Sequence, residues 1–123
     1  MLKNVLLVGM GGAVGSMLRY GCSVLINSRI FPWSTLLINV TGCFFIGLIF
    51  AFSLRDMHFL NHWKLFLATG ICGGFTTFSA FSLENMSLLQ SGKPGLAFLY
   101  IALSILLGIG ASFLGYYLFV RQT

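Results

Sequence analysis

The residues whose chemistry is most unusual lie between Gly70 and Ser82, inside an apolar stretch that also holds glycines, hydroxyl residues and phenylalanines. Inside a bilayer every backbone N–H and C=O needs a partner, so helix-weakening residues persist only beside protein or water. We expect the helix to break at Gly73–Gly74 and to be capped again by Thr76–Thr77. Carbonyls released near Gly73 and Thr76 are hard oxygen ligands that suit Na⁺.

The helix after this break predicts a second kind of chemistry. Phe78, Phe81, Ser82 and Asn85 have the i, i+3, i+4, i+7 spacing that places residues on one helical face. The edge of a phenyl ring is electropositive, so it can receive a small anion without a fixed charge that would trap it. Ser82 is a neutral donor that can replace part of the anion's water shell, so we predict that it lines the pore as well. Phenylalanines at this spacing usually face lipid or a core, but here they accompany hydroxyl and amide groups.

The elements that must position these residues follow from composition. The 123 residues are 58% hydrophobic and 7% charged, whereas a soluble domain has roughly 25% charged residues. A membrane-spanning helix takes about 20 apolar residues, so the chain has room for four. We predict an all-α membrane protein with one transmembrane domain, 1–123, in the cell (inner) membrane. The predicted spans are 2–26, 34–54, 63–90 and 96–120.

The first span carries Gly11-x-x-x-Gly15, which indicates close packing against a neighbouring helix. A dinucleotide-binding loop is excluded because the next acidic residue is Asp56, far beyond the position that such a fold requires. Arg19 has two interpretations that stay open. It snorkels to the membrane interface, or it lines the entrance of an anion pathway.

Two further spans contribute polar side chains. Asn39 must be hydrogen-bonded within lipid, so it either joins two helices or lines a pore, where its neutral amide replaces part of an anion's water shell. Tyr100, Ser104 and Ser112 recur at four-residue intervals, with Gly108 between them. Their hydroxyls could bond to carbonyls of their own helix or form a ladder of donors beside a pore.

The charge distribution gives almost no preferred orientation. Four spans place four basic residues on the side of the termini and three on the other; in order these are Lys3, Arg55, Lys64 and Arg121, against Arg19, Arg29 and Lys93. Since the Lys/Arg bias sets topology, we expect insertion in both orientations and an antiparallel homodimer in the lipid membrane. The basic residues form no stripe that would follow phosphates, so nucleic acid is not expected as a partner.

Two other function classes compete with a pore. A small four-span multidrug exporter needs a carboxylate within the membrane, and the only acid in a predicted span is Glu84. A non-transporting scaffold would leave the Asn39, Phe78 and Phe81 set without a purpose. The sequence holds no nucleophile–base–orienter set, so we predict that the protein is not an enzyme.

Taken together, three motifs resemble those of the Fluc (CrcB-type) fluoride channels over nearly the whole chain. They are Gly11-Gly12-x-x-Gly15-x-x-x-Arg19-Tyr20, Thr35-Leu36-x-x-Asn39-x-x-Gly42 and the longer Thr69-Gly70-x-Cys72-Gly73-Gly74-x-Thr76-Thr77-Phe78-Ser79-x-Phe81-Ser82-x-Glu84.

The resemblance implies a dual-topology homodimer with two pores that export toxic fluoride passively. It implies a structural Na⁺, not transported, held by the backbone carbonyls of Gly73 and Thr76. It also implies a set of pore-lining residues: Asn39, Phe78, Phe81, Tyr100, Ser104 and Ser112. The chain departs from the family at Ala80, where a threonine is usual, and at Gly108, where some relatives have serine.

Overall fold

The computed structural model describes residues 1–56, 58 and 62–122. Apart from its connections the described part is helical, and it contains no strand. Its elements are α1 (Leu2–Leu25), α2 (Trp33–Ser53), η1 (Leu65–Cys72), α3 (Gly73–Phe75), α4 (Phe78–Gln90) and α5 (Pro94–Arg121).

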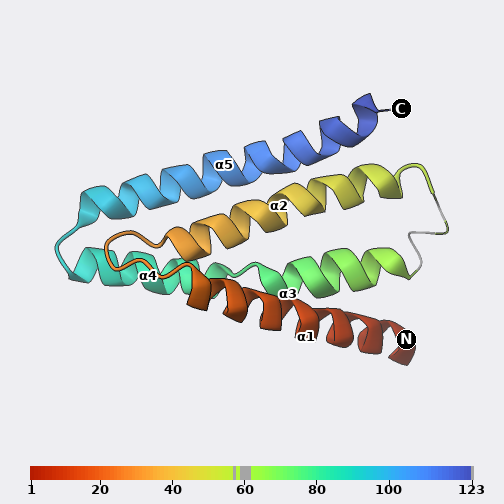
Figure 1. Cartoon of the computed structure of the whole chain (residues 1–123), viewed down its shortest axis with the longest axis horizontal. Helices are drawn as coiled ribbons and strands as arrows, with labels where there is room; N and C mark the ends of the chain where they lie inside the picture. Colours follow the sequence, from red (N-terminus) through yellow and green to blue (C-terminus); the bar gives the residue numbers. More distant parts are fainter. Residues whose placement is uncertain (57, 59–61, 123) are drawn as a thin grey trace.

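Four helical segments are long and apolar enough to cross a membrane, as the composition predicted. They are Leu2–Leu25, Trp33–Ser53, Leu65–Gln90 and Pro94–Arg121, and the third comprises η1, α3 and α4. Both termini lie at the same end as the connection between α2 and η1 (Figure 1). The α1–α2 connection and the α4–α5 turn lie at the other end.

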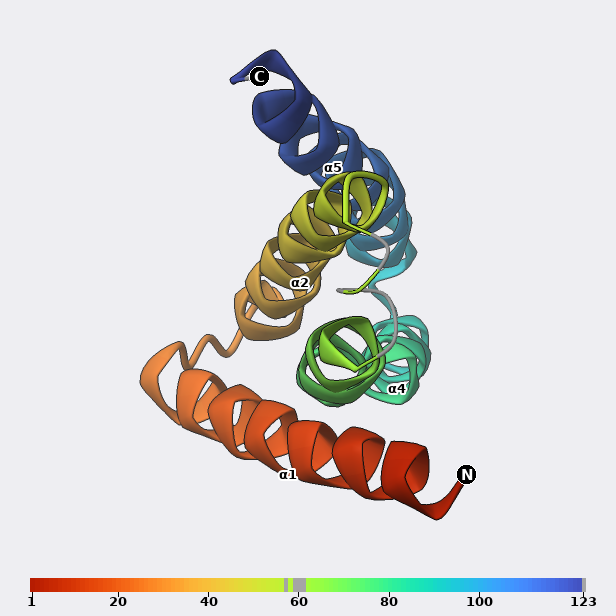
Figure 2. The ribbon, with the colours of Figure 1, turned by 90° about the vertical axis from the view of Figure 1, so that its right-hand side faces the viewer.

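Glycines bring the backbones of α1 and the third span together. A Cβ on Gly15 would collide with the carbonyl oxygen of Ile71, and one on Gly70 would lie 2.8 Å from Gly11 Cα. The packing role predicted for Gly11-x-x-x-Gly15 is therefore confirmed. The π-helical segment η1 contributes backbone atoms to this contact. Figure 2 shows α1 crossing the third span.

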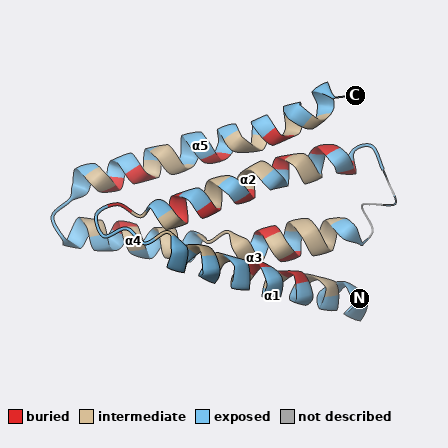
Figure 3. Ribbon diagram, viewed as in Figure 1, coloured by how far each residue is buried: buried red, intermediate tan, exposed pale blue. Residues whose placement is uncertain are grey.

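A second glycine contact joins α2 to α5. A Cβ on Gly47 would meet the carbonyl oxygen of Ser112, and one on Gly115 would meet that of Phe44. A small core of Phe31, Leu36 and Tyr100 lies where the connection before α2 meets α2, α4 and α5, and Tyr100 is fully buried there. Most of the outer surface of the four spans is exposed in the single chain (Figure 3), as expected for helices that face lipid or another subunit.

Candidate functional site

The third span is bent by 17°, and its two non-helical residues are Thr76 and Thr77. Thr76 has φ −79° and ψ 157°, and Thr77 has φ −150° and ψ 119°. The prediction placed the weak point at Gly73–Gly74, and that position was wrong, because both residues are helical. The predicted cap is confirmed, since Thr77 Oγ1 accepts the Ala80 N–H at 3.2 Å.

The extended backbone at Thr77 is held by Asn39 from α2. Asn39 Nδ2 donates to the Thr77 carbonyl at 3.1 Å, and the Thr77 N–H donates to Asn39 Oδ1 at 2.8 Å. The side-chain amide of Asn39 thus takes the hydrogen bonds that Thr77 would make within a helix. For this reason the interruption lies at Thr77 and not at the glycines before it. Asn39 does join two elements, and the structure also places it at the wall of a cavity.

The Asn39 pairing and the Thr77 cap each leave one backbone carbonyl without its helical donor. In an unbroken helix the N–H of Thr77 would donate to the Gly73 carbonyl, and that of Ala80 to the Thr76 carbonyl. Here these N–H groups donate to Asn39 Oδ1 and Thr77 Oγ1. The oxygens of Gly73 and Thr76 are therefore released from their helical donors. Among the described residues no cluster of three His, Cys, Asp or Glu side chains offers a competing metal site.

A cavity of about 350 Å³ lies beside the interruption, between α2, α4 and α5. Four of the predicted pore residues line it: Asn39, Phe78, Phe81 and Ser104. The rings of Phe78 and Phe81 are 5.5 Å apart, and Phe78 is 78% exposed in the single chain. Ser104 is part of this wall, and its Oγ is buried without a hydrogen-bond partner among the described residues.

The carboxylate of Glu84 is bound by two hydroxyls from other helices. Thr35 Oγ1 donates to Oε1 at 2.6 Å, and the Tyr100 hydroxyl donates to Oε2 at 2.7 Å. The Tyr100 ring also contacts the Phe81 ring edge-on, with centroids 5.0 Å apart. Sequence reasoning left the role of Glu84 open and did not name Thr35 as a site residue. The available signal was the spacing of Thr35 and Asn39, which share a face of α2.

The polar row of α5 points across to neighbouring helices. Tyr100 bonds to Glu84, and Ser112 Oγ donates to the Cys43 carbonyl of α2 at 3.1 Å. For Ser112, bonding to a carbonyl of its own helix was thus the wrong alternative. Ser112 lines a further cavity of about 400 Å³, which shares Ile46 with the cavity beside Phe78.

Two predicted site residues lie apart from this arrangement. Ser82 is exposed on α4, and Arg19 is half-buried on α1. Neither lines the cavities described above. Their roles stay predictions, and Arg19 keeps both of its interpretations.

Comparison with known proteins places these features in a family. Residues 6–116 match the family described as CrcB-like protein, Camphor Resistance (CrcB). The chain belongs to this family. The match extends from α1 into α5 and therefore includes every residue of the cavities and of the Glu84 cluster.

Relatives within the CrcB-like family resemble the chain along nearly its full length. A protein of Azobacteroides pseudotrichonymphae is 47% identical, with 96% of this chain and 97% of the relative covered. A protein of Thermus thermophilus is 48% identical, with 94% of each covered. A protein of Flavobacterium psychrophilum is 44% identical, with 93% and 94% covered. All three are named fluoride-specific ion channel FluC.

Proposed function

We propose that this chain is a channel that lets fluoride pass down its gradient across the cell membrane. The observation that carries the proposal is the cavity whose wall combines Phe78 and Phe81 with the neutral polar groups of Asn39 and Ser104. The fluoride-channel names of relatives with more than 40% identity support the same conclusion.

This wall suits a small anion for physical reasons. Phenyl edges attract an anion weakly, and amide or hydroxyl donors replace part of its water shell. Among the described residues no cationic side chain lines the cavity, so the ion meets no full charge that would hold it there. Weak binding at several sites is what conduction requires.

The functional unit of the proposal is an antiparallel homodimer. Phe78 is largely exposed in one chain, although it stands beside released backbone carbonyls. Such carbonyls cannot face acyl chains without cost, so a second copy supplies the missing cover. The four-to-three division of Lys and Arg between the two membrane sides favours neither orientation. Reporters fused to the C-terminus and active on one side only test this: signal from both sides is expected, and signal from one side would refute it.

A Na⁺ ion at the centre of this dimer completes the proposal. The carbonyl oxygens of Gly73 and Thr76 are hard ligands released from their helical donors, and two chains would supply four of them. This proposed ligand set contains no carboxylate. A bound Na⁺ would offset the negative ends of the carbonyl dipoles and would link the interrupted third spans of the two chains. We therefore assign it a structural role; it is not transported.

The test of the function is fluoride efflux from liposomes that contain the purified protein. Fluoride should leave rapidly, whereas chloride in a matched electrode assay should stay inside. A proton-driven exporter would instead move an organic cation such as ethidium when a pH gradient is applied. The structure gives no support to that alternative, because both oxygens of Glu84 are already bound by Thr35 and Tyr100. Ethidium transport without fluoride efflux would overturn the proposal.

A further inference from the structure

The polar row of α5 has a gap between the two cavities that it borders. Ser104 lines the Phe-lined cavity, which is the one of about 350 Å³ beside Phe78 and Phe81. Ser112 lines the cavity of about 400 Å³. Gly108 lies between the two serines on the same face of α5, and it has no side chain that could donate a hydrogen bond.

The thiol of Cys43 on α2 stands at this gap. A Cβ built on Gly108 would lie 3.6 Å from Cys43 Sγ, which is an ordinary van der Waals distance. The sulfur therefore lies directly beside the place from which a side chain at position 108 would project. Cys43 also belongs to the wall of the Phe-lined cavity, one helical turn after Asn39.

Cys43 also contacts the second cavity, through its backbone. Its carbonyl accepts a hydrogen bond from Ser112 Oγ at 3.1 Å, and Ser112 lines that cavity. Ile46, about one turn further along α2, lines both cavities. Cys43 is thus placed between the Phe-lined cavity and the Ser112 cavity, at the level where α5 contributes only Gly108.

A thiol can take the part that a hydroxyl would have at this position. It is neutral, it carries a weak S–H donor, and its sulfur is polarisable. A neutral donor replaces part of the water shell of an anion, and weak binding allows the anion to leave again. A serine at position 108 would offer a donor to the same space from the opposite helix.

We propose that Cys43 is a pore-lining residue of this chain, and that its thiol supplies the donor which the polar row of α5 lacks at Gly108. The inference rests on the proposed channel function and adds a residue of α2 to the pathway. It also gives the pathway a property that hydroxyls and amides do not have, because soft cations such as Ag⁺ select sulfur ligands. When Ag⁺ reacts, a silver–sulfur bond forms, the S–H bond breaks and the proton goes to water.

The first experiment asks whether a donor on α5 can replace the thiol. Fluoride efflux from liposomes is compared for the wild type, Cys43→Ala, Cys43→Ser and the double variant Cys43→Ala/Gly108→Ser. Cys43→Ala should slow efflux by roughly threefold to tenfold, the effect of about one lost hydrogen bond. Cys43→Ser should be at least as fast as the wild type, since a hydroxyl is the stronger donor. The double variant should regain most of the lost rate.

This comparison separates a donor from a packing residue. Size-exclusion chromatography on each preparation identifies variants that have lost the oligomeric state of the wild type. A Cys43→Ala variant with the wild-type rate would overturn the proposal. So would a double variant that keeps its oligomeric state and remains as slow as Cys43→Ala.

The second experiment asks whether the thiol faces the ion pathway. Efflux is measured in chloride-free buffer, in which Ag⁺ stays in solution, before and after Ag⁺ is added. The wild type should be blocked, because silver on Cys43 fills the space beside Gly108. Dithiothreitol should reverse the block by removing the silver. Cys43→Ser should conduct fluoride with and without Ag⁺, a result that a packing role alone would not produce.

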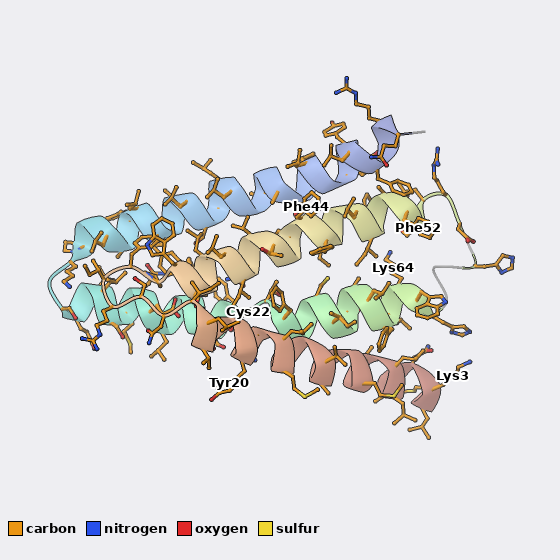
Figure 4. All side chains as sticks on the ribbon, in the orientation of Figure 1. Lys3, Tyr20, Cys22, Phe44, Phe52 and Lys64 are labelled. Carbon is orange, nitrogen blue, oxygen red and sulfur yellow. The ribbon has the colours of Figure 1, made fainter. Side chains whose placement is uncertain are left out.

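The other two cysteines provide matched controls. Cys22 lies on α1 (Figure 4) and Cys72 in η1, and neither lines the Phe-lined cavity. Cys22→Ser and Cys72→Ser should therefore remain sensitive to Ag⁺. A conducting wild type that Ag⁺ does not block, or a block that persists in Cys43→Ser, would overturn the role of Cys43 and leave the channel standing. A wild type without fluoride efflux would refute the channel itself.

Discussion

Asn39 and Thr77 are joined by two hydrogen bonds, with the amide of Asn39 bound to both the N–H and the C=O of Thr77. Because the Thr77 N–H is taken by Asn39, the Gly73 carbonyl loses its helical donor. Asn39 therefore contributes to the wall of the Phe-lined cavity and also releases the Gly73 carbonyl, a proposed cation ligand.

Asn39→Asp tests this double role. Aspartate can still accept from the Thr77 N–H, but it cannot donate to the Thr77 carbonyl and it carries a negative charge into the cavity wall. An uncompensated charge at a buried site costs several kcal/mol, so fluoride efflux should fall by more than about tenfold, a factor that corresponds to about 1.36 kcal/mol. Efflux from liposomes measures the effect, and wild-type rates would place Asn39 outside the pathway.

Phe81→Ile should abolish fluoride efflux while the protein keeps its oligomeric state. Isoleucine fills a similar space but has no electropositive ring edge to meet an anion. Efflux and size-exclusion chromatography are measured on the same preparation. Met86→Leu, an exposed position on the same helix, is the matched control and should behave as the wild type. Undiminished efflux in Phe81→Ile would remove its ring from the pore.

The Glu84 cluster predicts a stability effect as well as a functional one. Tyr100→Phe and Thr35→Val each remove one donor to the carboxylate. Leaving a buried acceptor without its donor costs about 1–3 kcal/mol, so each variant should melt at a lower temperature in detergent. If the two hydroxyls act on one carboxylate, their effects should be non-additive in a double-mutant cycle. Strictly additive losses would show that the cluster does not act as a unit.

The glycine contact between α1 and the third span predicts a contrast between two alanine variants. Gly15→Ala would drive a methyl group into the Ile71 carbonyl, whereas a Cβ on Gly9 meets no atom within 4 Å. Overpacking of this kind costs about 1–3 kcal/mol, so Gly15→Ala should lower Tm in detergent. Gly9→Ala should leave Tm unchanged or raise it, because alanine favours helix. Equal Tm values for the two variants would contradict the close backbone contact.

Removal of Na⁺ should weaken both activity and dimer stability. In the proposed dimer, the released carbonyls of Gly73 and Thr76 would then lack the cation that offsets their repulsion. Protein purified and reconstituted in N-methylglucamine buffer should lose fluoride efflux, and added Na⁺ should restore it. Protein depleted of Na⁺ that kept its full efflux rate would argue against the carbonyl site.

Properties encoded locally were predictable from the sequence. The number of spans follows from apolar runs of sufficient length, and the packing role of Gly11 and Gly15 follows from their spacing on one helical face. The grouping of Phe78 and Phe81 follows from helical periodicity in the same way. Each of these depends on neighbours within a few turns of one helix.

Only the tertiary structure decided where the third span departs from helix and what Glu84 does. The backbone of Thr77 is extended because an amide 38 residues away in sequence takes its N–H and C=O. Glu84 is held by hydroxyls 49 and 16 residues away, on two other helices. Contacts at such separations depend on how helices pack, and the local pattern of glycines indicated a different position for the interruption.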